Sequence, residues 1–156
     1  MPHAADFEPE FVAALRTLFE ERIAFNRLMG LSIGAISATG VTGELKMRPD
    51  LIGHHVHQRL HGGVISATLD AMAGLAIMAA IGARHLDEAL AQRMQRYAKL
   101  GTIDLRVDYL RPATGERFAL AAEVLRLGSR VASTRMEFRD GAGQLLATGA
   151  AAYIVS

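Results

Sequence analysis

Residues 62–83 form an almost wholly apolar run, GGVISATLDAMAGLAIMAAIGA, in which Asp70 is the only charged residue. As a helix, residues 62–82 extend about 31 Å, which is long enough to cross a bilayer. An ionised carboxylate near the middle of a bilayer is costly, and the flanking sequence carries no aromatic belt. We therefore predict a helix buried inside a globular domain. A helix that is apolar on every side must be wrapped by other secondary structure.

The rest of the chain contains the pattern of such a wrapper. After Gly101, apolar and polar residues alternate, and the apolar set is predicted to form the buried face of a strand: Ile103, Leu105, Val107 and Tyr109. Further strands are expected at residues 118–124, 132–138 and 145–155. Two more are expected within residues 31–49, separated by a glycine-bearing turn at 39–43, with the second running from Glu44 to Met47.

Helices flank the predicted sheet elements. Amphipathic helices are expected at residues 8–28 and 84–99, and a histidine-rich loop at residues 50–61. Together these elements predict one α+β domain over residues 1–156. In it, an antiparallel sheet of about six strands surrounds the long apolar helix.

The composition limits the class of protein. With 156 residues, 51% of them hydrophobic and 21% charged, the chain is expected to fold rather than remain disordered. Lysine and arginine number 17 against 16 acidic residues and are scattered, so no nucleic-acid partner is expected. Without cysteine, disulfides, thiolate nucleophiles and cysteine-based zinc sites are excluded. The start MPHAADFEPE lacks the features of a signal peptide, so we expect a cytoplasmic protein that does not span a membrane.

Asp70 has two interpretations inside such a domain. It is either a structural carboxylate with a buried partner or a catalytic one, since burying a carboxyl group in apolar surroundings is costly and raises its pKa. The sequence His61-Gly62-Gly63 favours the catalytic interpretation. These residues stand at the expected start of the helix, where free N–H groups and the positive end of the helix dipole suit a developing oxyanion.

The spacing of these residues predicts an assembly. Gly62 and Asp70 are eight residues apart, which is about 12 Å along a helix and too far for both to act on one carbonyl. If both act on one substrate, they come from different subunits. The chemistry therefore predicts a symmetric homodimer with the site at the interface, and such dimers can pair again into a homotetramer.

Other constellations in the sequence are weaker. His54, His55, His57 and His61 invite a metal site, but they are crowded and have no acidic or cysteine partner nearby, so a solvated loop without a metal is expected. Ser66 does not lie in a G-x-S-x-G nucleophile elbow. Glycine-rich phosphate-binding motifs are absent from the sequence.

Two segments resemble a known family. His61-Gly62-Gly63 followed by Asp70 is similar to the HGG…D signature of hot-dog fold thioesterases, the superfamily of the phenylacetate-pathway thioesterase. The stretch GTIDLRVDYLRP at residues 101–112, with GERF at 115–118, resembles the YigI-type acyl-CoA thioesterases of bacteria. The Phe25-Asn26-Arg27 segment agrees with that subgroup. The resemblance covers roughly residues 10–155.

The resemblance implies a fold and a set of roles. The fold is the hot-dog fold, an antiparallel sheet wrapped around a central helix. The N–H of Gly62 polarises the thioester carbonyl, and Asp70 of the partner subunit acts as nucleophile or as general base for water. His61 lies beside the thioester, and Thr102 helps to place the water. His55 stands where some relatives have a substrate-positioning asparagine.

The substrate implied by the resemblance is a medium- to long-chain fatty acyl-CoA, with a phenylacetyl-like group as the alternative. Coenzyme A is then part of the substrate, and no cofactor is expected. Gly63 at the helix start is a further candidate substrate-binding residue. Three arginines either meet the phosphates of coenzyme A or are ordinary surface and sheet-edge charges: Arg106, Arg111 and Arg117. The side chains of Ala71, Met72, Leu75 and Met78 either line an acyl tunnel or form ordinary core.

Two rival functions belong to other classes. A hot-dog dehydratase or hydratase needs an acid–base pair, and the Asp-x-Asn-Pro-x-His run of hydratases is missing. A non-catalytic acyl-CoA-binding regulator has no use for the costly Asp70 carboxylate. Hydrolysis of acyl-CoA, followed by thiol release, distinguishes both from a thioesterase.

Overall fold

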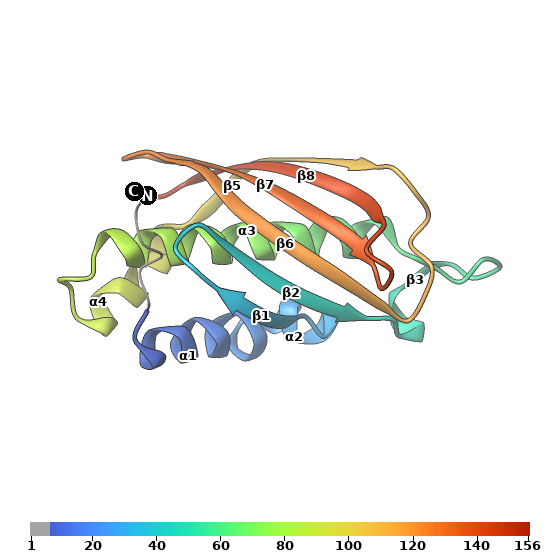
Figure 1. Cartoon of the computed structure of the whole chain (residues 1–156), viewed down its shortest axis with the longest axis horizontal. Helices are drawn as coiled ribbons and strands as arrows, with labels where there is room; N and C mark the ends of the chain where they lie inside the picture. Colours follow the sequence, from blue (N-terminus) through green and yellow to red (C-terminus); the bar gives the residue numbers. More distant parts are fainter. Residues whose placement is uncertain (1–6) are drawn as a thin grey trace.

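The computed structural model describes residues 7–156, in which a six-stranded antiparallel sheet curves around one long helix (Figure 1). The strand order is β1-β2-β6-β7-β8-β5. The strands are β1 (Ser32–Ile36), β2 (Gly40–Lys46), β5 (Gly101–Tyr109), β6 (Arg117–Leu127), β7 (Val131–Asp140) and β8 (Leu145–Ile154). This arrangement confirms the hot-dog architecture expected from the sequence. The opening residues 1–6, part of the segment used to argue against a signal peptide, lie outside the described residues.

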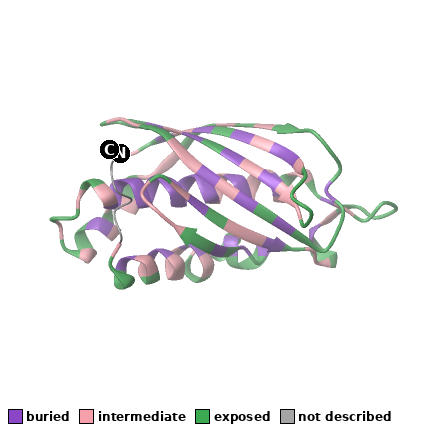
Figure 2. Cartoon of the chain, in the orientation of Figure 1, coloured by how far each residue is buried: buried purple, intermediate pink, exposed green. Residues whose placement is uncertain are grey.

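The central helix α3 (Gly62–Arg84) lies in the concave face of the sheet, and most of its length is buried (Figures 1 and 2). It is long and apolar enough to cross a membrane, but 72% of its most apolar window is buried inside the protein, which is the position of a core helix. Met72, Leu75 and Met78 are fully buried, and each contributes about 1.5–3 kcal/mol of transfer free energy. These three residues are therefore core and do not line a tunnel.

The N-terminal helix expected at residues 8–28 is broken. The structure has α1 (Pro9–Thr17), a turn of π-helix (η1, Leu18–Arg22) and α2 (Ala24–Met29). The break falls at Ile23, whose backbone is extended. The buried side chain of Asn26 donates from Nδ2 to the carbonyl of Phe19 at 3.0 Å, which satisfies a backbone acceptor in the irregular turn. The prediction of one continuous helix is wrong because this side-chain bond stabilises the interruption.

The helix expected at residues 84–99 is also shorter. Only α4 (Leu90–Gln95) is α-helical, and a 3₁₀ turn (η3, Arg96–Lys99) follows it. The preceding turn is tied to this segment by the ion pair of Glu88 with Arg96. The histidine-rich loop contains a 3₁₀ turn (η2, Pro49–Leu51) and a small hairpin of β3 (Ile52–His54) and β4 (Arg59–Leu60).

The glycines between the first two strands have different roles from those expected. The turn lies at residues 37–39, and β2 already begins at Gly40, so the predicted turn at 39–43 and strand start at Glu44 are wrong. Gly43 lies inside β2, where a Cβ atom would approach the sulfur of Met72 to 2.9 Å. A glycine is needed there because the central helix packs closely against the sheet.

The two edges of the sheet differ. Side chains of the N-terminal helices cover the outer edge of β1: Glu20 Oε1 accepts the N–H of Ile33 at 2.5 Å, and Arg16 donates to the carbonyls of Ile33 and Gly34. At the other edge, β5 pairs only with β8 within the described chain. The open edge of β5 presents unpaired backbone groups, which favour pairing with another strand.

Candidate active site

Asp70 lies half-buried on α3 and faces the last two strands of the sheet. Thr102 Oγ1 on β5 donates to Asp70 Oδ1 at 3.0 Å. The hydroxyl of Tyr153, on β8, shares its one proton between the same oxygen and the backbone carbonyl of Asp70, which lies 2.6 Å from it. Burial raises the pKa of Tyr153 above its usual range, with a further contribution from the hydrogen bond to Asp70. The phenol therefore stays protonated and acts as a donor.

Thr102 reaches Asp70 because of a β-bulge. Thr102 pairs with Tyr153 and Asp104 pairs with Ala152, so Ile103 has no partner on β8. The extra residue turns Thr102 to the face of the strand that meets the helix and leaves Ile103 57% exposed. The predicted alternation of buried and exposed residues is therefore wrong at this end of β5, where Ile103 was expected to be buried.

A pocket of about 230 Å³ opens beside Asp70. Its wall combines α3, the start of β5 and the irregular N-terminal helices. Apolar and aromatic side chains dominate the lining, which includes Phe19, Ile23, Phe25, Ala71, Tyr97 and Leu100. The rings of Phe19 and Tyr97 meet edge to face at 5.9 Å between centroids. Such a pocket suits a hydrocarbon or an aromatic group next to a carboxylate.

The start of α3 forms a second locus. His61 caps the helix, since its Nδ1 accepts the N–H of Gly63 at 2.8 Å. The Gly63 N–H is therefore occupied and is not one of the free donors expected at the helix start. For the N–H of Gly62, the described part of the chain provides no acceptor. The hydroxyl of Tyr109 donates to the Gly62 carbonyl at 2.7 Å and so holds this turn against β5.

Gly62 and Asp70 belong to different hollows of the same chain. Gly62 lines a pocket of about 340 Å³ together with Arg59, Tyr109 and Arg111. None of the residues around this pocket also lines the pocket beside Asp70. Arg111 is exposed, and its Nη1 donates to the carbonyl of Leu145 at 2.9 Å.

Of the histidine-rich segment, His61 belongs to the second locus, whereas His54, His55 and His57 line neither pocket. His55 occupies the exposed turn between β3 and β4 and lines neither pocket. The rings of His54 and His57 stack at 4.8 Å. Within residues 7–156, no three or more histidine or acidic side chains gather in a group that could hold a metal ion.

Comparison with known proteins identifies the family. The sequence profile of the thioesterase superfamily matches residues 57–147, more than half of the chain. The medium/long-chain acyl-CoA thioesterase YigI of Escherichia coli (strain K12) is 36% identical over 138 residues, which are 88% of this chain and 89% of YigI. The chain belongs to the thioesterase superfamily.

Solved structures of this superfamily share the fold. A Shewanella oneidensis protein related to the thioesterase superfamily superposes with a TM-score of 0.88 and 37% identity, covering 96% of this chain and all of that one. Zebra fish thioesterase superfamily member 2 has a TM-score of 0.75 at 20% identity, covering 96% and 99% of the two chains, and is similar in fold. The resemblance stated from the sequence, and with it the expectation of an enzyme, is confirmed.

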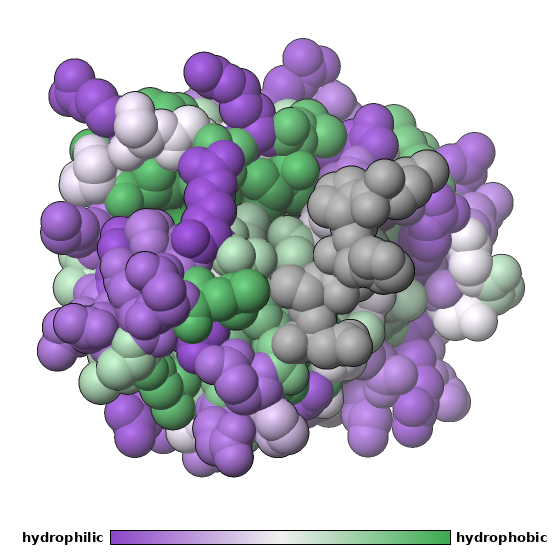
Figure 3. Space-filling view, turned by 60° about the vertical axis from the view of Figure 1, so that its left-hand side comes forward, coloured by the Kyte–Doolittle hydropathy of each residue, from purple (hydrophilic) through white to green (hydrophobic). Residues whose placement is uncertain are grey.

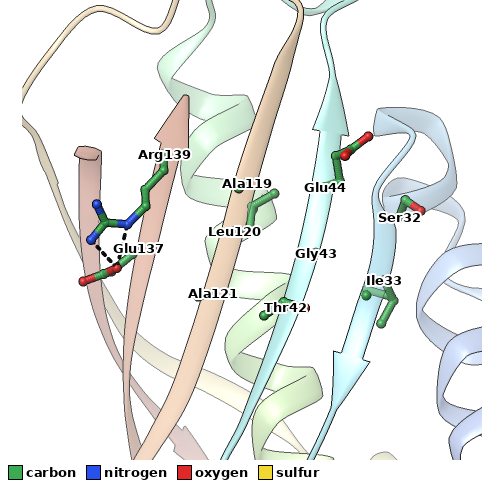
Figure 4. Close-up of a pocket in the computed structure, with 11 residues that line it drawn as sticks. Ser32, Ile33, Thr42, Gly43, Glu44, Ala119, Leu120, Ala121, Glu137 and Arg139 are labelled. Atoms are coloured by element: carbon green, nitrogen blue, oxygen red, sulfur yellow. Dashed lines mark hydrogen bonds and ion pairs between the residues drawn. The ribbon is translucent and has the colours of Figure 1, made fainter. Parts of the chain in front are cut away.

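A larger hollow of this thioesterase, about 550 Å³, lies on the outer face of the sheet, away from both loci (Figure 4). Its floor consists of short side chains such as Thr42, Ala119 and Ala121, and one wall carries the Glu137–Arg139 ion pair, 2.7 Å apart. It contains neither Asp70 nor Gly62. Figure 3 shows a different side of the molecule, on which hydrophilic side chains surround apolar ones near the centre of the view.

Sequence reasoning selected Asp70, Gly62 and Thr102 and missed Tyr153. A lone tyrosine in an alanine-rich strand has no motif around it, and it lies 83 residues from Asp70 in sequence. The sequence does not reveal the register of β5 against β8, in which Tyr153 pairs with Thr102.

Proposed function

We propose that this thioesterase hydrolyses medium- to long-chain fatty acyl-CoA to the free fatty acid and coenzyme A. The observation that supports this most directly is the Asp70 carboxylate, hydrogen-bonded by Thr102 and Tyr153 at the wall of a mainly apolar pocket. The similarity to YigI, which carries medium/long-chain acyl-CoA thioesterase in its name, supports the same substrate class. No cofactor is needed, and the proposed location is the cytoplasm.

The proposed site is shared between two subunits. Gly62 and Asp70 are about 12 Å apart along α3 and line separate pockets of one chain. The open edge of β5, with exposed Ile103, Tyr109 and Leu110 on or beside it, is the proposed homodimer contact. Pairing of the two copies of β5 would bring the Gly62 pocket of one subunit towards the Asp70 pocket of its partner. Two such dimers would form the homotetramer.

The chemistry follows from the two loci. The free N–H of Gly62, at the positive end of the α3 dipole, donates to the thioester oxygen and stabilises the charge that develops there. Asp70 either attacks the carbonyl carbon, giving an anhydride that water then hydrolyses, or removes a proton from the attacking water. In both cases the carbon–sulfur bond breaks and coenzyme A leaves as the thiol. His61 orients the helix start, Thr102 helps to place the water, and Arg111 is available to a coenzyme A phosphate.

The aromatic lining supports a second candidate substrate. Phe19, Phe25 and Tyr97 surround the pocket, and an aryl group can pack against such rings. A phenylacetyl-like acyl-CoA is therefore the alternative substrate. The other alternative is a protein that binds acyl-CoA without hydrolysing it.

A panel of coenzyme A thioesters tests these proposals. Thiol release from purified protein is measured with straight-chain substrates from acetyl-CoA to palmitoyl-CoA and with phenylacetyl-CoA. We expect kcat/KM to rise with chain length into the medium- to long-chain range. Preference for phenylacetyl-CoA would replace the fatty substrate by the aryl one. Saturable binding without thiol release would replace the enzyme by a binding protein.

A further inference from the structure

The two hydrogen-bond donors to the Asp70 carboxylate, Thr102 and Tyr153, bind the same oxygen. Thr102 Oγ1 and the Tyr153 hydroxyl donate to Oδ1, and nothing within residues 7–156 donates to Oδ2. The single proton of the Tyr153 hydroxyl is shared with the backbone carbonyl of Asp70, 2.6 Å from the hydroxyl oxygen. Two donors on one oxygen fix the plane of the carboxylate and leave Oδ2 for a substrate or a water in the pocket.

The two donors differ in how firmly they are held. Within the single chain Thr102 is exposed, and it lies next to the β-bulge near the start of β5. Tyr153 is 3% exposed on a strand that is paired on both sides, between β7 and β5. Its ring is fixed by packing, and burial keeps its hydroxyl protonated by raising its pKa. Tyr153 is therefore the donor that restricts the carboxylate most.

We propose that Tyr153 is a positioning residue that fixes the Asp70 carboxylate through its hydroxyl, so that Oδ2 is the reacting oxygen. The proposal rests on the proposed function, because Tyr153 acts only through Asp70. It makes Tyr153 neither a proton donor to the leaving group nor an anchor for the acyl chain. Loss of the hydroxyl frees the carboxylate to rotate, and a misplaced reacting group lowers the rate of the chemical step without weakening binding.

The variant Tyr153→Phe removes the hydroxyl and keeps the ring. We expect kcat for acyl-CoA hydrolysis to fall about 10- to 100-fold, the range for a hydrogen bond to a charged group. KM and the affinity for a non-hydrolysable thioether analogue of acyl-CoA should not change, and analogue binding also shows that the site is folded. The matched control is Thr134→Val, which removes another buried hydroxyl, one that donates to the carbonyl of Ala151 on β8 at 3.3 Å. It should lower the melting temperature and leave kcat unchanged.

A double-mutant cycle separates positioning from structure. In the Asp70→Asn background, Tyr153→Phe should lower the residual rate less than about twofold, because the group it positions is gone. Equal losses in both backgrounds, or a higher KM at unchanged kcat, would overturn the proposal. Normal turnover of Tyr153→Phe beside an inactive Asp70→Asn would overturn the positioning role alone. Normal turnover of Asp70→Asn would overturn the catalytic role of Asp70 and the positioning role with it.

Discussion

Replacing Gly62 by proline removes the proposed oxyanion donor with little change to the backbone. Gly62 is the first residue of α3, a position where proline is well tolerated. The preceding His61 has φ −64° and ψ 134°, the extended conformation that a following proline requires. The matched control is Gly62→Ala, which keeps the N–H. Its Cβ would lie 3.3 Å from the ring of Tyr109, so this variant measures the effect of crowding alone.

The expected loss is that of one oxyanion donor. Removing such a donor lowers kcat by about 10²–10³, or about 2.7–4 kcal/mol of transition-state stabilisation. Gly62→Pro should show this loss in a thiol-release assay, whereas Gly62→Ala should retain most of the activity. Equal losses in the two variants would refute the role of the Gly62 N–H.

Subunit mixing then tests whether the site is shared. Asp70→Asn is nearly isosteric, but its amide is neither a base nor a competent nucleophile, so kcat should fall by about 10² or more. In a shared site, a mixed dimer of Gly62→Pro and Asp70→Asn has one site with both lesions and one intact site. Random exchange at equal amounts makes half of the dimers mixed, which restores about one quarter of wild-type activity. No recovery, in mixtures that native mass spectrometry shows to contain mixed dimers, would refute the shared site.

Two further predictions concern stability. Gly43→Ala should lower the free energy of unfolding by about 1–3 kcal/mol in a denaturant titration, because its Cβ would overpack against Met72. The control is Gly141→Ala, whose Cβ would lie 3.7 Å from the carbonyl oxygen of Arg117. Equal effects of the two substitutions would refute the close-packing argument. The hydrogen bond from Arg93 lowers the pKa of Glu8 below its ordinary value. The stabilisation that this hydrogen bond gives the folded protein is therefore present above the unfolded-state pKa of Glu8. It is lost as the pH falls through the folded-state pKa of Glu8. Glu8→Gln should be less stable than wild type at neutral pH and equally stable in acid, and a difference that persists in acid would contradict this.

The sequence alone determined the architecture because its patterns are local. An apolar run at residues 62–83 requires a wrapper, and the period-two strands after Gly101 provide one. The histidine–glycine–glycine motif and Asp70 marked the helix start and the carboxylate, because both lie on one continuous element whose geometry is fixed by residue spacing.

The tertiary structure decided what depends on register and on packing between distant segments. The bulge at Ile103 turns Thr102 inward, and its cause lies in the pairing of β5 with β8, which alternation along β5 does not reveal. Tyr153 meets Asp70 only because that register places it opposite Thr102. The helix is interrupted at Ile23, which lines the pocket, where the Asn26 side chain bonds the Phe19 carbonyl across the turn. Periodicity describes which face a residue takes within one element, whereas these features are set by the free energy of contacts between elements.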